Sequence, residues 1–314
     1  FKQKTAYEIR LSLVGSEMCI RDRVQGDNSS TPFEIIFSGP LSHTGTTTLG
    51  SNSGGNITLS GDNSMIGTVN LNVNSSNAYF GGANLNSAHA LGAANNTVNF
   101  LSNLVIDNTS GALVTFDRSY NYVAGTFRFR GTNSLNMGTG PVTLSSNPTF
   151  TVFRNELTFG GIVSGAGVNL TKDGQAGVLV LTGANTYTGI TTVSNGILRA
   201  NDNTGLPGLT SSGGGSNLTL NGGVWESSAN LYRVGNTGQG QMRITGGTSG
   251  FSARGAAVNA AFTTAAGDDT PVAQTWGVGS FSPGTLVLNE WTANNTLNFQ
   301  NAVDFNGSAR TVNV

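Results

Sequence analysis

The chain has 314 residues, of which 45 are glycine and only 10% are charged, and its formal net charge is −1. Charges this sparse and this nearly balanced exclude bulk electrostatic attraction to nucleic acid or to an anionic membrane surface. No apolar run approaches the roughly 20 residues of a transmembrane helix, so we expect no nucleic-acid partner and no membrane span in this segment.

Residues 1–23 differ from the rest of the chain in composition. They carry eight of the 31 charged residues and the only cysteine, Cys19. The segment resembles the translated sequencing-adapter read-through found at the ends of gene predictions from environmental DNA, and we interpret it as non-native. Residues 24–314 then form one repeat domain without cysteine, which excludes disulfides and a cysteine nucleophile. We expect this domain to be truncated at one or both ends, with the native N-terminus missing.

Short strands separated by Gly and Asn turns recur along residues 24–314, and Ser, Thr and Asn replace Lys and Glu as the polar set. This composition favours strands and tight turns over helices. Ile57 to Leu71 aligns with Leu179 to Val193 at a constant offset of 122 residues. Units this short cannot bury an apolar face alone and must stack on their neighbours. The sequence therefore predicts an all-β fold, a single-stranded right-handed parallel β-helix of roughly a dozen coils of ~20 to 25 residues.

Few residues offer catalytic or metal-binding chemistry. The two histidines, His43 and His89, have no acidic neighbour in sequence and are interpreted as exposed turn residues. Loop Asp268–Asp269 is interpreted as a solvated turn, with a Ca²⁺ site as the alternative. The acids with the most polar company, each expected to be an isolated surface turn residue, are Asp107, Asp117 beside Arg118, and Asp268 with Asp269. We therefore predict no metal, no cofactor and no catalytic residue.

The best candidate for ligand contact is the stretch from Thr126 to Arg130. Strand alternation places Phe127 and Phe129 on one face and Arg128 and Arg130 on the other. The arginine pair could bind an acidic sugar or a surface carboxylate, and the alternative is a half-buried strand with the phenylalanines in the core. A second possibility is that three tryptophans form sugar-stacking platforms on one exposed wall: Trp225, Trp276 and Trp291.

Residues 170–200 contain three strand-like runs, with strands predicted at residues 177–182, 191–193 and from Ile197 onwards. We interpret this stretch as one coil, in which Leu179 and Leu181 point inward and Val178, Val180 and Thr182 point outward. It resembles the autotransporter-associated β-strand repeat of bacterial secreted proteins. The residues that fall on that pattern are Leu170, Thr171, Lys172, Gly174, Leu179, Leu181, Thr182, Gly183, Asn185, Thr186, Tyr187, Thr188, Gly189, Thr191, Thr192, Val193, Gly196 and Leu198.

The resemblance implies a structural or adhesive passenger segment of a large secreted or surface-displayed bacterial protein, extracellular or at the outer-membrane surface. It also implies an outer-membrane translocator or a sorting tail beyond Val314. The partner would be a cell-surface or extracellular polysaccharide. The alternatives are a carbohydrate-active β-helix, such as a polysaccharide lyase or a glycosidase, or a carbohydrate-binding adhesin. Cleavage would require convergent carboxylates on one wall, which the sparse acids do not predict, so we expect no enzymatic activity.

Residues 250–314 are expected to continue the solenoid less regularly. Ala265 to Pro271 has the composition of a loop that leaves the coil. Strands are predicted to resume at Thr285–Leu288 and Thr296–Phe299, and Arg310–Val314 is predicted to be a strand with an open edge.

Overall fold

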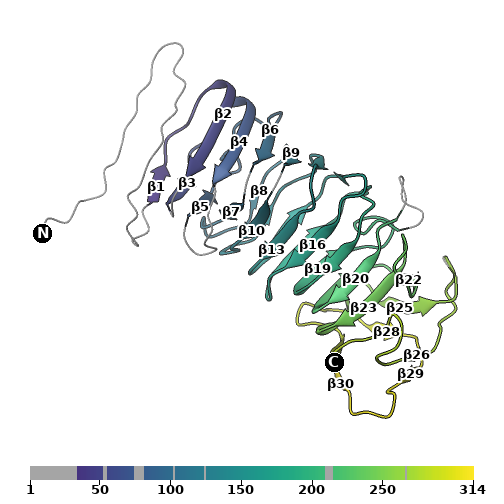
Figure 1. The fold of residues 1–314 in the computed structure, drawn as a ribbon. Coiled ribbons are helices and arrows are strands. Elements are labelled where there is room, and N and C mark those ends of the chain that lie inside the picture. Colours follow the sequence, from purple (N-terminus) through teal and green to yellow (C-terminus); the bar gives the residue numbers. More distant parts are fainter. Residues whose placement is uncertain are drawn as a thin grey trace, which may run out of the picture.

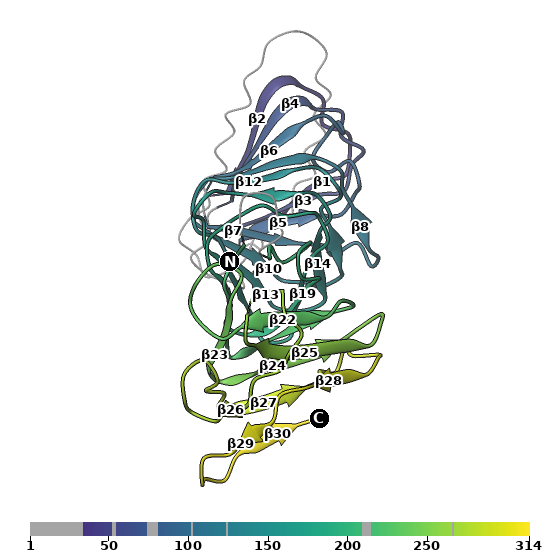
Figure 2. The same ribbon diagram turned by 90° about the vertical axis from the view of Figure 1, so that its right-hand side faces the viewer.

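The computed structural model describes residues 34–51, 55–73, 81–101, 103–123, 125–208, 215–265 and 267–314. Every regular element in these ranges is a β-strand. The strands stack into an elongated parallel β-solenoid of about 11 turns, with β1 near one end and β30 at the other (Figures 1 and 2). The predicted β-helix is thereby confirmed, whereas residues 1–23 lie outside the described residues.

Three long sheets form the walls of the solenoid. The ten-stranded sheet consists, in spatial order, of β1 (Glu34–Phe37), β3 (Asn56–Leu59), β5 (Gly82–Leu85), β7 (Leu104–Asp107), β10 (Thr126–Phe129), β13 (Thr149–Val152), β16 (Leu170–Asp173), β18 (Thr191–Val193), β20 (Leu218–Asn221) and β23 (Met242–Gly246). The nine-stranded sheet consists of β8 (Val114–Thr115), β11 (Leu135–Asn136), β14 (Glu156–Phe159), β17 (Val178–Leu181), β19 (Gly196–Ala200), β21 (Gly223–Ser227), β24 (Thr248–Ala253), β27 (Thr285–Leu288) and β30 (Thr311–Asn313). The six-stranded sheet consists of β2 (Thr44–Ser51), β4 (Ile66–Val73), β6 (Thr97–Phe100), β9 (Ser119–Tyr122), β12 (Val142–Leu144) and β15 (Val163–Ser164).

Two smaller sheets close the C-terminal third, where the six-stranded sheet has ended. They are the three-stranded sheet of β22 (Leu231–Val234), β25 (Val258–Thr263) and β28 (Leu297–Phe299), and the pair β26 (Gln274–Thr275) with β29 (Val303–Asp304). The loop expected at Ala265 to Pro271 lies between β25 and β26, and β30 forms the edge of the nine-stranded sheet. Residues 250–314 thus continue the solenoid with less regular sheets, as predicted.

Alternation along each strand separates a core column from an outer wall. On β10 the inward Phe127 and Phe129 are fully buried, and aromatic rings from all three long sheets meet in the middle of the solenoid. The centroid of the Phe127 ring lies 5.1 Å from that of Phe100 on β6 and 5.4 Å from that of Phe150, and the Phe150 centroid lies 5.4 Å from that of Phe159 on β14. These contacts join the sheets into one continuous core.

The repeat at residues 170–200 forms the predicted strands but covers more than one coil. β16 and β18 are successive strands of the ten-stranded sheet, and β17 and β19 are successive strands of the nine-stranded sheet. The interpretation of this stretch as a single coil was therefore wrong: β18 and β19 already belong to the next one. Residues paired in register are 21 positions apart between β16 and β18 and 19 positions apart between β17 and β19, which makes one coil shorter than the 31-residue repeat.

The inward direction predicted for Leu179 and Leu181 is confirmed. The alignment of these residues with Ile57 and Leu59, however, does not place the two stretches on the same wall. Leu179 and Leu181 lie in the main core, and so do Ile57 and Leu59. However, β3 belongs to the ten-stranded sheet and β17 to the nine-stranded sheet. An offset of 122 residues thus moves the pattern to a different wall, because this offset is not a whole number of coils.

The outer wall of the six-stranded sheet carries a row of uncharged polar side chains in register. The register aligns Thr48, Asn70, Asn99 and Asn121. Asn99 Nδ2 donates to Asn70 Oδ1 at 2.8 Å, and Asn121 Nδ2 donates to Asn99 Oδ1 at 2.9 Å. Such side-chain ladders stabilise identically placed residues of stacked parallel strands, and here they hold three successive coils together from outside the core.

We expect the change Leu181→Asp to lower the free energy of unfolding by about 4 kcal/mol or more, since it removes a buried side chain and leaves an unpaired charge in the core. Thr182→Asp is the matched control, because the neighbouring Thr182 is exposed. Urea denaturation followed by circular dichroism measures both. If the two variants unfold at the same urea concentration, Leu181 does not point inward.

Candidate functional site

The predicted Arg128–Arg130 pair lies on the outer wall, with both phenylalanines in the core. Arg130 is committed to its own structure: its Nη2 donates to the carbonyl of Gly81 at 2.9 Å and its Nη1 to Asn56 Oδ1 at 3.2 Å. Gly81 adjoins β5 and Asn56 belongs to β3. Because β7 lies between β5 and β10, the side chain of Arg130 crosses β7. Outward-facing Val105 on β7 is fully buried. Arg130 therefore links three strands of the ten-stranded sheet and covers Val105. Ligand contact at the Arg128–Arg130 pair stays a prediction.

The tryptophans do not form one exposed wall. Trp225 and Trp276 are buried in the core, whereas the side chain of Trp291 is 72% exposed. Trp276 Nε1 donates to the carbonyl of Pro283 at 2.7 Å. The possible stacking platform of all three rings is therefore excluded, because Trp225 packs into the core from β21 and Trp276 is buried in the turn after β26.

The histidines are exposed, as expected. The ring of His89 contacts the carboxylate of Asp62, a residue 27 positions earlier in the chain. Sequence neighbours could not reveal this contact, because coiling brings Asp62 to the loop that contains His89. Both side chains are more than half exposed, so the pair adds little to stability.

Of the four acids expected at the surface, one is buried. Asp107 is buried: its carboxylate accepts bonds from the backbone N–H of Asn108 and from both the N–H and the hydroxyl of Thr132, which lies in the next coil. Its assignment as a surface turn residue was therefore wrong. Asp117 is exposed, and hydrogen bonds from Thr139 lower the pKa of its carboxyl.

The loop acids Asp268 and Asp269 remain a solvated turn. Asp268 accepts hydrogen bonds from Thr264 and Thr270, which lower the pKa of its carboxyl. Arg118, expected beside a surface acid, is buried and donates to backbone carbonyls, including that of Asp117. Within the described ranges, no three His, Cys, Asp or Glu side chains come close enough to hold a metal ion.

Two carboxylates do converge on one cation, at residues that the sequence did not single out. On the outer wall of the nine-stranded sheet, Arg199 Nη1 lies 2.7 Å from Glu156 Oε1 and Arg199 Nε lies 2.6 Å from Glu226 Oε1. The Glu156 side chain is 38% exposed and that of Glu226 is fully buried. The other oxygen of Glu226 accepts hydrogen bonds from the hydroxyls of Ser252 and Thr292. Both oxygens of the buried carboxylate are therefore occupied.

Arg199 crosses a strand in the same way as Arg130. Glu156 is on β14 and Arg199 on β19, so their ion pair spans β17, which lies between them. The outward Val178 and Val180 of β17 form a separate buried apolar cluster with Ile197. The outward direction predicted for these valines is correct. Their burial is explained by the arginine that passes over them, whose aliphatic stem packs on apolar surface while its head binds a carboxylate.

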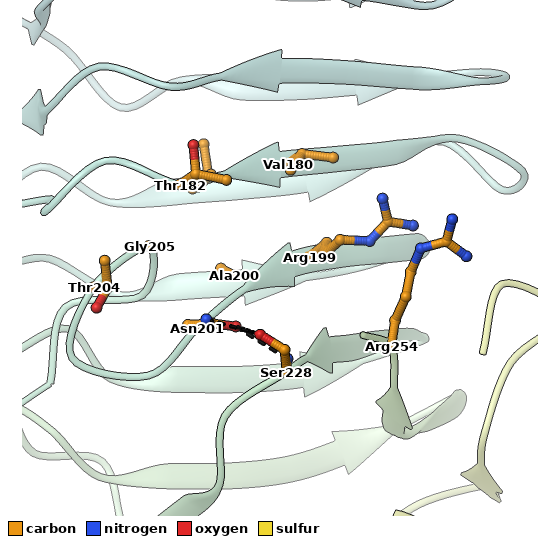
Figure 3. A pocket seen from close by; sticks show the side chains of 10 residues that line it. Val180, Thr182, Arg199, Ala200, Asn201, Thr204, Gly205, Ser228 and Arg254 are labelled. Atoms are coloured by element: carbon orange, nitrogen blue, oxygen red, sulfur yellow. Dashed lines mark hydrogen bonds between the residues drawn. The ribbon is translucent and has the colours of Figure 1, made fainter. Parts of the chain in front are cut away.

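A pocket of about 170 Å³ opens beside this ion-pair cluster. Figure 3 shows the guanidinium groups of Arg199 and Arg254 at one end and polar side chains at the other, with Val180 and Ala200 between them. The polar group consists of Thr182, Asn201, Thr204 and Ser228. Asn201 and Ser228 are joined by a hydrogen bond of 3.0 Å.

The two arginines of the pocket differ in their partners. Arg254 donates to the backbone carbonyl of Thr292 but makes no ion pair with any residue that the structure describes. The Nη2 group of Arg199 is buried and has no hydrogen-bond partner in the described part of the chain. An unpaired buried donor costs about 1 to 3 kcal/mol, so this end of the pocket holds unused donors.

Lys172 points into the core rather than to solvent. It follows Leu170 in the inward alternation of β16 and is fully buried. Its ammonium group donates to the backbone carbonyls of Asp173, Gly174 and Asn195 at 2.7, 3.0 and 3.0 Å. It thereby links a turn of one coil to the corresponding turn of the next. Gly196 is required beside it, since its φ is +65° and a Cβ there would lie 2.3 Å from the carbonyl oxygen of Gly174 and 2.8 Å from Nζ.

Comparison with known proteins identifies the segment that contains Lys172. Residues 170–200 match the family model of the passenger-associated-transport-repeat, which confirms the resemblance found in the sequence. No curated protein and no solved structure matches the chain. The repeat and the solenoid together support a passenger-type β-helical segment. The family suggests an extracellular or surface-displayed protein.

The buried carboxylate of Glu226 predicts a large difference between two otherwise similar substitutions. We expect Glu226→Gln to lower the free energy of unfolding by about 3 kcal/mol or more, because it removes the buried partner of an ion pair. Glu156→Gln, which removes the half-exposed partner of the same arginine, should cost no more than about 1 kcal/mol. Urea denaturation of both variants gives the comparison. Equal effects would contradict the structural role assigned to Glu226.

Lys172 predicts that stability rises with pH. Burial lowers the pKa of Lys172 from 10.5 to about 7, against a smaller opposite effect of Asp173. Between pH 7 and 9 the unfolded chain therefore keeps a proton that the folded chain has lost. The free energy of unfolding should increase by up to about 1.4 kcal/mol per pH unit in this window. Lys172→Met should flatten that dependence. A wild-type protein whose stability does not change from pH 7 to 9 would contradict the assignment.

Proposed function

We propose that this β-helical segment is a structural and adhesive, non-catalytic part of a large secreted or surface-displayed bacterial protein. The observation that carries the proposal is the uninterrupted stacking of parallel strands in the described residues, which contains a passenger-associated repeat. A translocator or sorting tail elsewhere in the full protein belongs to this proposal.

The structural part of the proposal is supported by how neighbouring coils are joined. Inside, Lys172 and the aromatic rings connect successive coils, and outside, the asparagine ladder of the six-stranded sheet does so. Repeats that contact only their neighbours build length without enlarging the core. Such a rod suits a stalk that holds other parts of a protein away from a cell surface.

The adhesive part of the proposal is supported by the chemistry of the walls. The six-stranded sheet presents a regular row of amides and hydroxyls, and the nine-stranded sheet presents a pocket with two guanidinium groups. Both kinds of surface suit sugars, which offer many hydroxyls and, in acidic polymers, carboxylates. Extracellular or cell-surface polysaccharide is therefore the proposed partner.

A carbohydrate-active β-helix is the second candidate, because Glu156, Arg199 and Glu226 bring two carboxylates and a cation together on one wall. A general base must be free to reach the proton that it removes. Glu226 is fully buried with both oxygens bonded, and Glu156 is ion-paired. This arrangement supports a structural role for the carboxylates over a catalytic one.

We expect purified residues 24–314 to leave pectate, alginate and neutral glucans intact during prolonged incubation, because the converging carboxylates are already paired. Reducing-end assays detect hydrolysis, and absorbance of unsaturated products detects lyase activity. Turnover that is lost in Glu156→Gln but kept in Asp117→Asn would replace the adhesive proposal by the enzymatic one. Asp117→Asn is the control, since this acid is exposed and contacts Thr139.

The structural proposal has its own measurement. Limited proteolysis of folded residues 24–314 should leave the stacked coils intact at protease concentrations that degrade the Leu181→Asp variant, because cleavage requires local opening of the chain. Equal digestion of both proteins would contradict a rod built for stability.

A further inference from the structure

We propose that the pocket lined by Arg199 and Arg254 binds a single sugar unit that carries a carboxylate, such as the uronic acid residue of an acidic polysaccharide. This inference deepens the adhesive part of the proposed function and rests on it. It also moves the acidic-sugar site from the Arg128–Arg130 pair to another wall of the solenoid.

The size of the pocket limits its occupant to one small unit. Its volume of about 170 Å³ lies below the roughly 300 to 1,000 Å³ of pockets for larger ligands. The pocket is on the outer wall of the nine-stranded sheet, between the level of β17 and that of β24, and is open to solvent. One residue of a long polymer can therefore enter while the rest of the polymer remains outside.

The distribution of polar groups matches the two chemical ends of a uronic acid. Arg199 and Arg254 bring two guanidinium groups to one end of the pocket (Figure 3). A planar carboxylate can accept two parallel hydrogen bonds from the fork of guanidinium donors. At the other end, the hydroxyls of Thr182, Thr204 and Ser228 can donate to and accept from sugar hydroxyls.

The partners of the two arginines leave Arg254 as the guanidinium more available to an anion. Arg199 already binds Glu156 and Glu226, and its Nη2, which has no partner among the described residues, is buried. Arg254 has no carboxylate within ion-pair distance in the described chain.

The charge balance sets the strength of binding. Two arginines and two glutamates sum to zero, so the wall does not attract anions over long distances. Recognition comes from short contacts, and we expect a dissociation constant in the millimolar range, which corresponds to about 4 kcal/mol. Affinity for a whole polymer rises when several copies of the protein bind along it.

The test compares three probes and three variants of residues 24–314 by NMR titration or calorimetry. The probes are trigalacturonate, neutral galactotriose and a sulfated galactan trisaccharide. We expect trigalacturonate to bind at least tenfold more tightly than either other probe. Arg254→Gln should weaken that binding at least tenfold, with Arg254→Lys in between because it keeps the charge and loses the fork. Arg128→Gln on the other wall is the matched control and should bind like the wild type.

Several outcomes would overturn the proposal. Equal binding of trigalacturonate and galactotriose excludes carboxylate recognition, and equal binding of the sulfated probe shows that charge alone decides. Loss of binding in Arg128→Gln but not in Arg254→Gln places the site on the ten-stranded wall. In that last case adhesion survives and only the pocket assignment fails. If none of the three probes binds, the pocket assignment is contradicted. In that case co-sedimentation with neutral glucan tests separately whether the protein is adhesive. Thermal unfolding of each variant verifies that it is folded.

Discussion

Register between successive parallel strands is the constraint on which the rest of this structure depends. Each inward residue lies on the equivalent residue of the coils before and after it, so a change of one residue in register would turn a whole strand inside out. The aromatic contacts among Phe100, Phe127, Phe150 and Phe159 exist only because three sheets keep that register together. The asparagine ladder depends on it equally, since its amides meet only when their strands are aligned.

Arginine has a second structural use in this fold, which accounts for much of its sparse charge. Arg130 and Arg199 each start on one strand, cross its neighbour and bond beyond it. In both cases the crossed strand carries outward valines that are buried. A long side chain with an apolar stem and a charged head can cover such a position without adding a layer to the protein. The walls therefore tolerate aliphatic residues on their outer face where an arginine is two strands away.

The sequence was sufficient to predict local features and insufficient for those that depend on coil length. Strands β17 and β18 lie where Gly and Asn turns and alternating Val, Leu and Thr place them, and the Phe and Arg faces of β10 follow from alternation alone. The partners of Asp107 and of Arg199 depend on which residue lies one or more coils away. The separations between residues paired in register on adjacent coils range from 19 to 39 residues. A single loop whose length cannot be predicted from the sequence therefore changes which residues meet in every later coil.

Sequence patterns also could not predict that the charged residue Lys172 lies in the core. Lysine is almost never fully buried unless it is paired, so Lys172 would be assigned to the surface by composition. What admits it is a turn whose carbonyls face inward, and a glycine at position 196 that leaves room for the ammonium group.

The grading of burial along the rod has a mechanical consequence. The middle coils are filled by large rings that are fully buried, whereas β28 and β30 consist of half-exposed and exposed residues. Under a pulling force, coils with the least buried surface detach first. Strands paired in register at the C-terminal end are 26 to 39 residues apart, so each detached coil releases roughly 90 to 140 Å of extended chain. The rod would therefore lengthen in steps of unequal size, beginning at the C-terminal coils. Its aromatic centre would act as the segment that yields last.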